Sequence, residues 1–97
     1  MNKETAQPAG LISVLLDKSA PLGDRDDAAM DLEAFDDQTV QSALLEVLLN
    51  LEEDDGLVTT AAESYGQIWA NSGKPNFDAP LDEMHPAAKA YFRDHFS

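Results

Sequence analysis

The side chains able to carry chemistry in this chain are two histidines, six serines and many carboxylates, and there is no cysteine. His85 stands beside Pro86 and His95 lies near the end of the sequence, where a solvated surface position is expected. No serine lies in a G-x-S-x-G turn, and the five glycines are too scattered to form a phosphate-binding loop. Because catalysis needs a nucleophile, a base and an orienting group together, we expect no catalytic residues, no cofactor and no enzymatic activity.

One acidic segment, Glu52 to Gly56, has the composition of a calcium-binding loop. An EF-hand loop has glycine at its sixth position, and with Gly56 there the first ligand would be Leu51 and the twelfth Ala62. Neither side chain coordinates calcium, so the sequence predicts no metal site. The segment is better explained as a solvated acidic turn that caps the following helix.

Acidic side chains dominate the charge, since 19 Asp and Glu against 6 Lys and Arg give a net charge of −13. Such a chain repels the phosphates of nucleic acids and anionic lipid surfaces, so neither is an expected partner. The segment 26–72 has no Lys or Arg and twelve acids, namely Asp26, Asp27, Asp31, Glu33, Asp36, Asp37, Glu46, Glu52, Glu53, Asp54, Asp55 and Glu63. A cationic partner surface would relieve this repulsion, and an ordinary solvated acidic face is the alternative.

The spacing of apolar residues is helical along the chain and predicts an all-α fold without strands. The expected helices span about 11–16, 24–35, 40–51, 58–71 and 86–96, with a loop at 75–80 and a turn at 81–84. Asp24 is the expected N-cap of the second helix, and Pro86 opens the last helix. Inward positions of the last helix are expected at Ala87, Ala90, Tyr91 and Phe96. Short connections make successive helices antiparallel neighbours.

The second and fourth expected helices repeat one another at an offset of 33 residues. Five pairs then coincide: Arg25 with Val58, Ala28 with Ala61, Ala29 with Ala62, Leu32 with Tyr65 and Phe35 with Ile68. The paired alanines have a packing role, because small side chains let the two helices of a pair approach closely. An offset of this size indicates two repeated helix pairs.

The stretches LLDKSAPLGDRDDAAMDLEAF and LEEDDGLVTTAAESYGQIW resemble the short HEAT-like repeats of phycobilisome lyases, in which an Asp-rich turn, Val-Arg, Ala-Ala and Leu-Gly succeed one another. The resemblance covers about residues 11–71. It implies a single domain, 1–97, in which two antiparallel helical hairpins stack and a C-terminal helix caps them. Arg25-Asp26 and Val58-Thr59 replace the Val-Arg pair, so the arginine that joins repeats in that family is missing or displaced.

In HEAT-like proteins the second helix of each pair lines the concave side, and the outward positions on the two corresponding helices are expected to meet a partner. The expected outward positions also include Ala34, and the acidic turns around them are expected to form a rim. The predicted partner-binding residues are Asp27, Met30, Asp31, Asp36, Asp37, Glu53, Asp54, Asp55, Thr60, Glu63, Ser64 and Gln67. Met30, Trp69 and Tyr91 are candidate anchors, although the apolar stripe of its helix also explains Trp69 as a core residue.

These features predict a small, acidic, cytoplasmic, non-enzymatic protein that neutralises a basic protein partner. In character it is similar to bacterial immunity proteins that inhibit a cognate nuclease toxin, as in contact-dependent growth inhibition, some of which have HEAT-like folds. Charge complementarity would speed association and make it salt-sensitive. Two alternatives stay open: an adaptor in a larger assembly, and a lyase-like subunit that binds a small molecule. The sequence shows no secretion signal.

Overall fold

The computed structural model describes residues 8–72 and 80–96, and over these ranges it contains five α-helices, two 3-10 helices and no strand. The α-helices are α1 Ala9–Leu16, α2 Leu22–Asp31, α3 Gln38–Leu49, α4 Asp55–Asn71 and α5 Pro86–Phe96. The 3-10 helices are η1 Leu32–Ala34, which continues α2, and η2 Leu81–Glu83, which precedes α5. The all-α prediction is therefore confirmed for the described residues. Most of the loop expected at 75–80 lies outside them.

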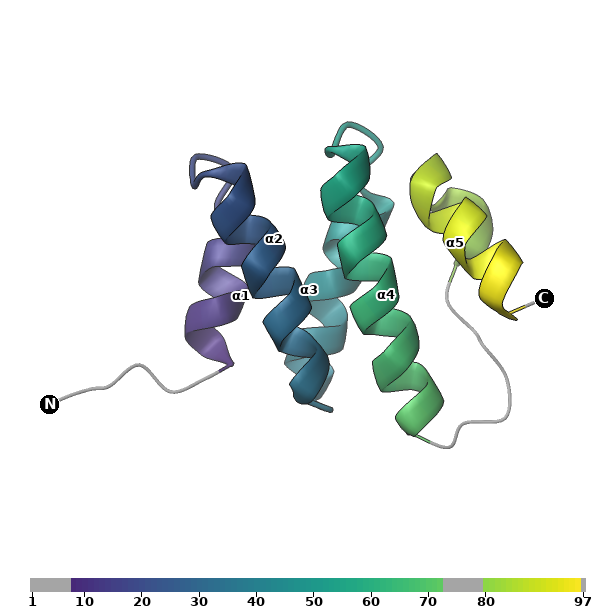
Figure 1. Ribbon diagram of the computed structural model, residues 1–97, viewed down its shortest axis with the longest axis horizontal. Helices are drawn as coiled ribbons and strands as arrows, with labels where there is room; N and C mark the ends of the chain where they lie inside the picture. The colour runs from purple at the N-terminus through teal and green to yellow at the C-terminus, as the bar shows by residue number, and fades with distance from the viewer. Residues whose placement is uncertain (1–7, 73–79, 97) are drawn as a thin grey trace, which may run out of the picture.

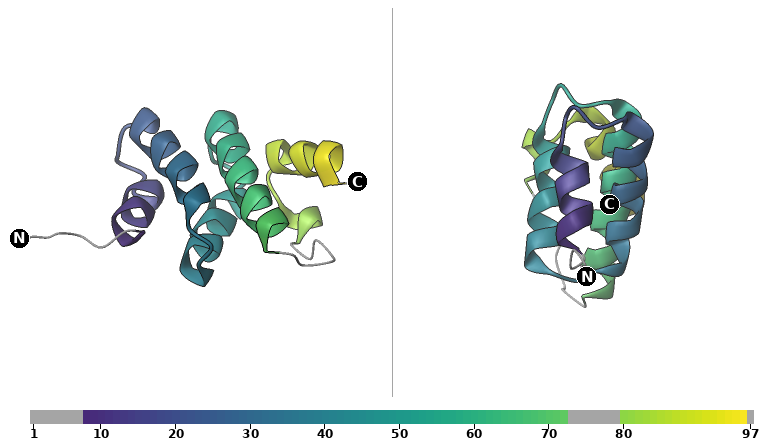
Figure 2. Two further views of the ribbon diagram at one scale, coloured as in Figure 1. Left: turned by 60° about the horizontal axis from the view of Figure 1, so that its bottom comes forward. Right: turned by 90° about the vertical axis from the view of Figure 1, so that its left-hand side faces the viewer.

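The helices form two antiparallel pairs that lie side by side, α1 with α2 and α3 with α4 (Figure 1). Viewed from the α1 end, α2 and α4 make one layer and α1 and α3 make the other (Figure 2). Helix α5 packs against α4, so that α4 touches α2, α3 and α5. The α1–α2 hairpin forms one end of the molecule and α5 forms the other.

Side-chain caps set the beginnings of α3 and α4. Asp37 accepts a hydrogen bond from the backbone N–H of Thr39 at 2.7 Å, and Asp54 accepts one from Leu57 at 3.1 Å. Helix α2 differs from the prediction, because it begins at Leu22 after Pro21 and places Asp24 inside the first turn. The Pro21 carbonyl accepts the Arg25 N–H at 3.1 Å as the first hydrogen bond of the helix, and no side chain caps this end.

Two predicted helix ends are also corrected. Helix α2 stops at Asp31 and passes into η1, and Phe35 is extended with φ −117° and ψ 108°. Helix α3 stops at Leu49 because Asn50 is extended, with ψ 101°, so Leu51 leaves the apolar stripe and is 63% exposed.

The core is one continuous cluster to which every α-helix contributes. Both aligned alanine pairs lie in it, since Ala28, Ala29, Ala61 and Ala62 are all at most 2% exposed. The inward face predicted for α5 is wrong at Ala90, which is exposed. Its buried residues are instead Ala88 and Phe92, four residues apart and hence on one face. The side chain of Phe96 lies outside the described part.

The 33-residue repeat extends from the helices into the turns between them. Asp17 ends α1 with φ −84° and ψ 101°, and its counterpart Asn50 ends α3 with φ −87° and ψ 101°. Each side chain accepts a backbone N–H two residues on, from Ser19 at 3.0 Å and from Glu52 at 3.1 Å. Asp and Asn share this turn geometry. The turns that follow α1 and α3 therefore share the same backbone geometry at Asp17 and Asn50.

Candidate protein-binding surface

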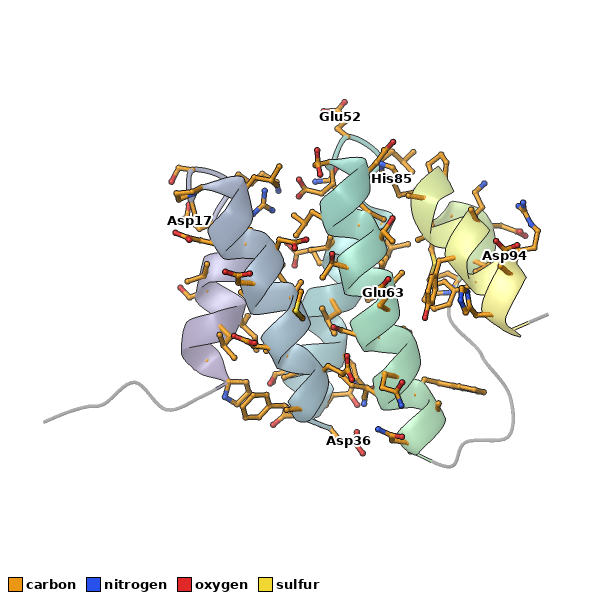
Figure 3. The ribbon with its side chains drawn as sticks, viewed as in Figure 1. Asp17, Asp36, Glu52, Glu63, His85 and Asp94 are labelled. Carbon is orange, nitrogen blue, oxygen red and sulfur yellow. The ribbon has the colours of Figure 1, made fainter. Side chains whose placement is uncertain are left out.

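The predicted acidic rim is divided between the two ends of the helix pairs (Figure 3). Asp36, in the connection from α2 to α3, lies at one end, and Glu52, in the connection from α3 to α4, lies at the other. Successive connections of antiparallel helices alternate between ends, so these two turns cannot form one rim. Asp36 and Asp37 are exposed at the first end, and Asp54 and Asp55 at the second.

Ser64 does not face outward as expected. It is 1% exposed, and its hydroxyl donates a hydrogen bond to the Ala29 carbonyl at 2.7 Å, which joins α4 to α2. Thr60 is half-buried and its hydroxyl donates to the Gly56 carbonyl at 3.1 Å. These hydroxyls are engaged within the protein.

Five predicted residues of α2 and α4 are exposed, on a surface that we call the open face: Asp27, Met30, Asp31, Glu63 and Gln67, of which Asp27 and Asp31 lie at its edge toward α1. Ala34, just beyond α2, is exposed as well. Met30 is a large apolar side chain that is 53% exposed, and Glu63 projects from the middle of α4 (Figure 3). Within residues 8–72 and 80–96 no ion pair engages the carboxylates of this face. The face therefore presents unneutralised negative charge beside an apolar side chain.

Glu53 is withdrawn from the surface by a buried ion pair with Arg25. The Arg25 guanidinium donates to both Glu53 oxygens, at 2.7 and 3.2 Å, and the two side chains are only 6% and 9% exposed. These hydrogen bonds hold the pKa of Glu53 below its ordinary value of 4.5, although burial acts in the opposite direction. Arg25 also donates through Nε to the Leu15 carbonyl at 2.9 Å. Arg25 thus joins the two hairpins. The resemblance to HEAT-like repeats had predicted that an arginine in this role is missing or displaced.

His85 is buried, and it attaches α5 to the turn between α3 and α4. Its backbone N–H donates to the Leu48 carbonyl at 2.7 Å, and its Nδ1 accepts the Ala87 N–H at 3.0 Å. Because a backbone N–H can only donate, Nδ1 is unprotonated and Nε2 carries the ring hydrogen. Nε2 then donates to the Glu53 carbonyl at 2.9 Å, with an Asp55 carboxylate oxygen 3.4 Å away.

A hollow of about 250 Å³ lies along the first hairpin, on the seam between α1 and α2. Its apolar lining is Leu11, Val14 and Ala28, and its acidic lining is Asp24, Asp27 and Asp31. We call this hollow the end groove. Sequence reasoning missed Asp24 as a site residue because it assigned that carboxylate to a helix cap. The spacing of 24, 27 and 31, which places all three on one helix face, was the available signal.

A second hollow, of about 220 Å³, lies near the turns that hold the buried ion pair. It is lined by Leu16, Lys18, Arg25, Glu46, Val47, Asn50 and Glu53. The two charges deepest in it, on Arg25 and Glu53, are paired with each other. Both hollows are smaller than the roughly 300 to 1,000 Å³ typical of small-molecule sites.

The other candidate anchors are partly covered. Trp69 and Tyr91 are each half-buried, and the Tyr91 ring stacks on His95 with centroids 4.1 Å apart. Burial, followed by the negative charges of Glu63 and Glu33, raises the pKa of Tyr91.

Within residues 8–72 and 80–96, no group of three or more His, Asp or Glu side chains is placed to hold a metal ion. None of the helices described is both long enough and apolar enough to cross a bilayer. Comparison of the chain with protein-family models, with curated proteins and with solved structures gives no match.

Proposed function

We propose that this chain is a small non-enzymatic binding protein that recognises a basic protein surface through the exposed acidic residues of α2 and α4. The observation that carries the proposal is the open face of these helices, where Asp27, Asp31 and Glu63 have no ion-pair partner among the described residues. A cationic surface would remove the repulsion between these carboxylates and gain their Coulomb attraction.

The same face offers an apolar contact, which a binding surface needs in addition to charge. Charge complementarity raises the rate of encounter, whereas affinity depends on a few packed anchors. Met30 is 53% exposed and stands between Asp27 and Asp31 in the sequence, so it is the expected anchor. Tyr91, half-buried on α5, is a further candidate anchor.

The two equivalent hairpins favour a short helical-repeat module of the HEAT-like type as the scaffold. Its expected arrangement is a stack of two repeats with α5 as the C-terminal cap. Repeat modules present extended surfaces for binding other proteins, because each unit contributes the same helix to the same face.

A cognate nuclease toxin is the basic partner that we propose, with this chain as its cytoplasmic immunity protein. A nuclease binds an anionic substrate, so its active-site surface must be cationic. An acidic protein of −13 net charge offers the complementary potential and would cover that surface.

The experiment uses a purified basic nuclease domain encoded beside the gene for this chain. Stopped-flow association rates are measured at about 50 mM and about 500 mM NaCl, together with inhibition of nucleic acid cleavage. We expect inhibition and a rate at least about tenfold higher in low salt. The triple reversal of Asp27, Asp31 and Glu63 to Lys should slow association while the circular dichroism of the fold is kept.

The matched control reverses three exposed acids away from this face, Glu46, Glu52 and Glu83, and changes the net charge equally. If both triple variants slow association equally, the effect is one of net charge and the proposed face is wrong. If no basic protein binds at low salt, the proposed function itself fails.

A further inference from the structure

The end groove occupies the stacking face of the first hairpin. Adding 33 to each residue that lines it gives the corresponding positions of the second hairpin: Leu44, Val47, Leu57, Thr60, Ala61 and Ser64. Leu44, Val47, Leu57, Ala61 and Ser64 are at most 2% exposed, and Ser64 bonds directly to the first hairpin through Ala29. In the first hairpin, by contrast, Leu11 and Val14 are partly exposed and Asp24, Asp27 and Asp31 are exposed, while Ala28 is buried as its counterpart Ala61 is.

The groove keeps its apolar floor but exchanges its other residues for acids. Leu11, Val14 and Ala28 correspond to Leu44, Val47 and Ala61, and thus preserve the apolar character of the covered face. The remaining positions change from Leu57, Thr60 and Ser64 to Asp24, Asp27 and Asp31. The face that is covered in the α3–α4 hairpin is thus retained in the α1–α2 hairpin as an open groove, which three carboxylates of α2 line.

We infer that the end groove receives a basic amphipathic helix of another protein, which lies on α1 and α2 as the first hairpin lies on α3 and α4. The inference rests on the proposed function and specifies the part of the basic partner that is recognised. Carboxylates three and four residues apart span about 10 Å along α2, which matches cationic residues on two turns of an opposing helix. The apolar stripe of such a helix would cover the exposed parts of Leu11 and Val14, beside the buried Ala28.

A second copy of this chain is a less suitable occupant, because each copy has a net charge of −13. A head-to-tail contact between copies would also leave the same groove open on the next molecule and generate filaments. The occupant is therefore a different, positively charged chain.

The test uses a synthetic helix of about 15 residues with Leu and Ala on one face and three Arg beside that face. A peptide of the same composition in scrambled order is the control for non-specific charge. Binding is measured by fluorescence anisotropy, and the contacted residues are located by backbone amide chemical shifts. We expect the ordered helix to bind at least about tenfold more tightly than the scrambled peptide, with shifts along α1 and α2.

Two sets of variants separate an effect of the groove from an effect of net charge. Asp24→Asn, Asp27→Asn and Asp31→Asn together should weaken binding about tenfold or more, whereas Glu46→Gln, Glu52→Gln and Glu83→Gln together should change it less than about twofold. Val14→Thr replaces part of the apolar floor at nearly constant volume and should weaken binding about threefold. The ordered-helix binding and both variant effects are required for the inference.

Other outcomes overturn the inference in distinguishable ways. Equal effects of the two triple sets, or shifts confined to the open side of α4 around Glu63, would place recognition elsewhere and leave the proposed function standing. Lack of peptide binding, with the nuclease domain still bound, would mean that the groove is a polar end cap. Self-association that the Asp24, Asp27 and Asp31 variant abolishes would identify a second copy as the occupant. Failure of every basic probe would remove the proposed function as well.

Discussion

Glu53→Gln tests whether the buried ion pair joins the two hairpins energetically. The substitution keeps the shape of the side chain but removes the charge that faces Arg25, whose side chain is 6% exposed. Breaking a buried ion pair by neutralising one partner costs about 3 to 5 kcal/mol, because the other charge is left without compensation. The glutamine oxygen can still accept one hydrogen bond from Arg25, so we expect the lower figure, about 3 kcal/mol.

Urea unfolding followed by circular dichroism measures this loss directly, and thermal unfolding should show a fall in Tm of about 15 °C for a domain of this size. Glu52→Gln is the matched control, since Glu52 lies in the same turn, is exposed and has the same chemistry. Replacing both partners, Arg25→Met with Glu53→Leu, should be less destabilising than Glu53→Gln alone, because no buried charge then remains.

The stability contributed by the Arg25–Glu53 ion pair should fall as the pH is lowered. The hydrogen bonds from Arg25 lower the pKa of Glu53 below 4.5 in the folded protein. The stability contributed by the pair is therefore complete above that value and is lost as the pH falls through the folded pKa. The stability difference between the native protein and Glu53→Gln should narrow on acidification. If Glu53→Gln lowers the free energy of unfolding by less than about 1 kcal/mol at neutral pH, and by no more than Glu52→Gln does, the reasoning is refuted. Such a small loss is typical of an exposed ion pair.

Three further substitutions test other contacts. Ser64→Ala should cost about 1 to 2 kcal/mol in urea unfolding, because the Ala29 carbonyl loses its hydrogen bond, whereas exposed Ser42→Ala should have little effect. Asp37→Ala should lower Tm at neutral pH. The difference in Tm from the native protein should close at acid pH, because the Thr39 hydrogen bonds lower the pKa of Asp37. Equal differences in Tm at both pH values would contradict this. His85→Ala should speed amide exchange in α5 about tenfold or more while α1 and α2 stay protected, in contrast to His95→Ala, and uniform acceleration would contradict a local role.

The helices were predictable from sequence where a single apolar stripe determines packing. Helix α3 is the clearest case, because Val40, Ala43, Leu44, Val47 and Leu48 recur at helical spacing and are all at most 4% exposed. The paired alanines followed from the repeat for the same reason, since small residues are needed where helices approach closely. The turn equivalence of Asp17 and Asn50 was missed because it depends on shared backbone geometry and not on residue identity.

The error at Ser64 has a physical cause. A helical wheel assigns one buried side, but α4 has α2, α3 and α5 around it, so residues on the flanks of its apolar stripe are buried too. Ser64 is covered by α2, and its polar group was read as a sign of exposure. His85 and Arg25 meet Glu53 across 32 and 28 residues, and spacing along one helix contains no information about such contacts.

The acids of the end groove exceed what an end cap requires. A terminal repeat needs a polar outer face for solubility, and Thr or Ser, as at positions 60 and 64, would supply polarity without charge. Three aspartates at 24, 27 and 31 add like-charge repulsion of about 0.2 to 0.5 kcal/mol for each pair one turn apart. Leu11 and Val14 remain partly exposed beside these carboxylates. The carboxylate repulsion reduces the stability of an isolated chain, and it is relieved when a basic helix whose apolar side covers Leu11 and Val14 occupies the groove.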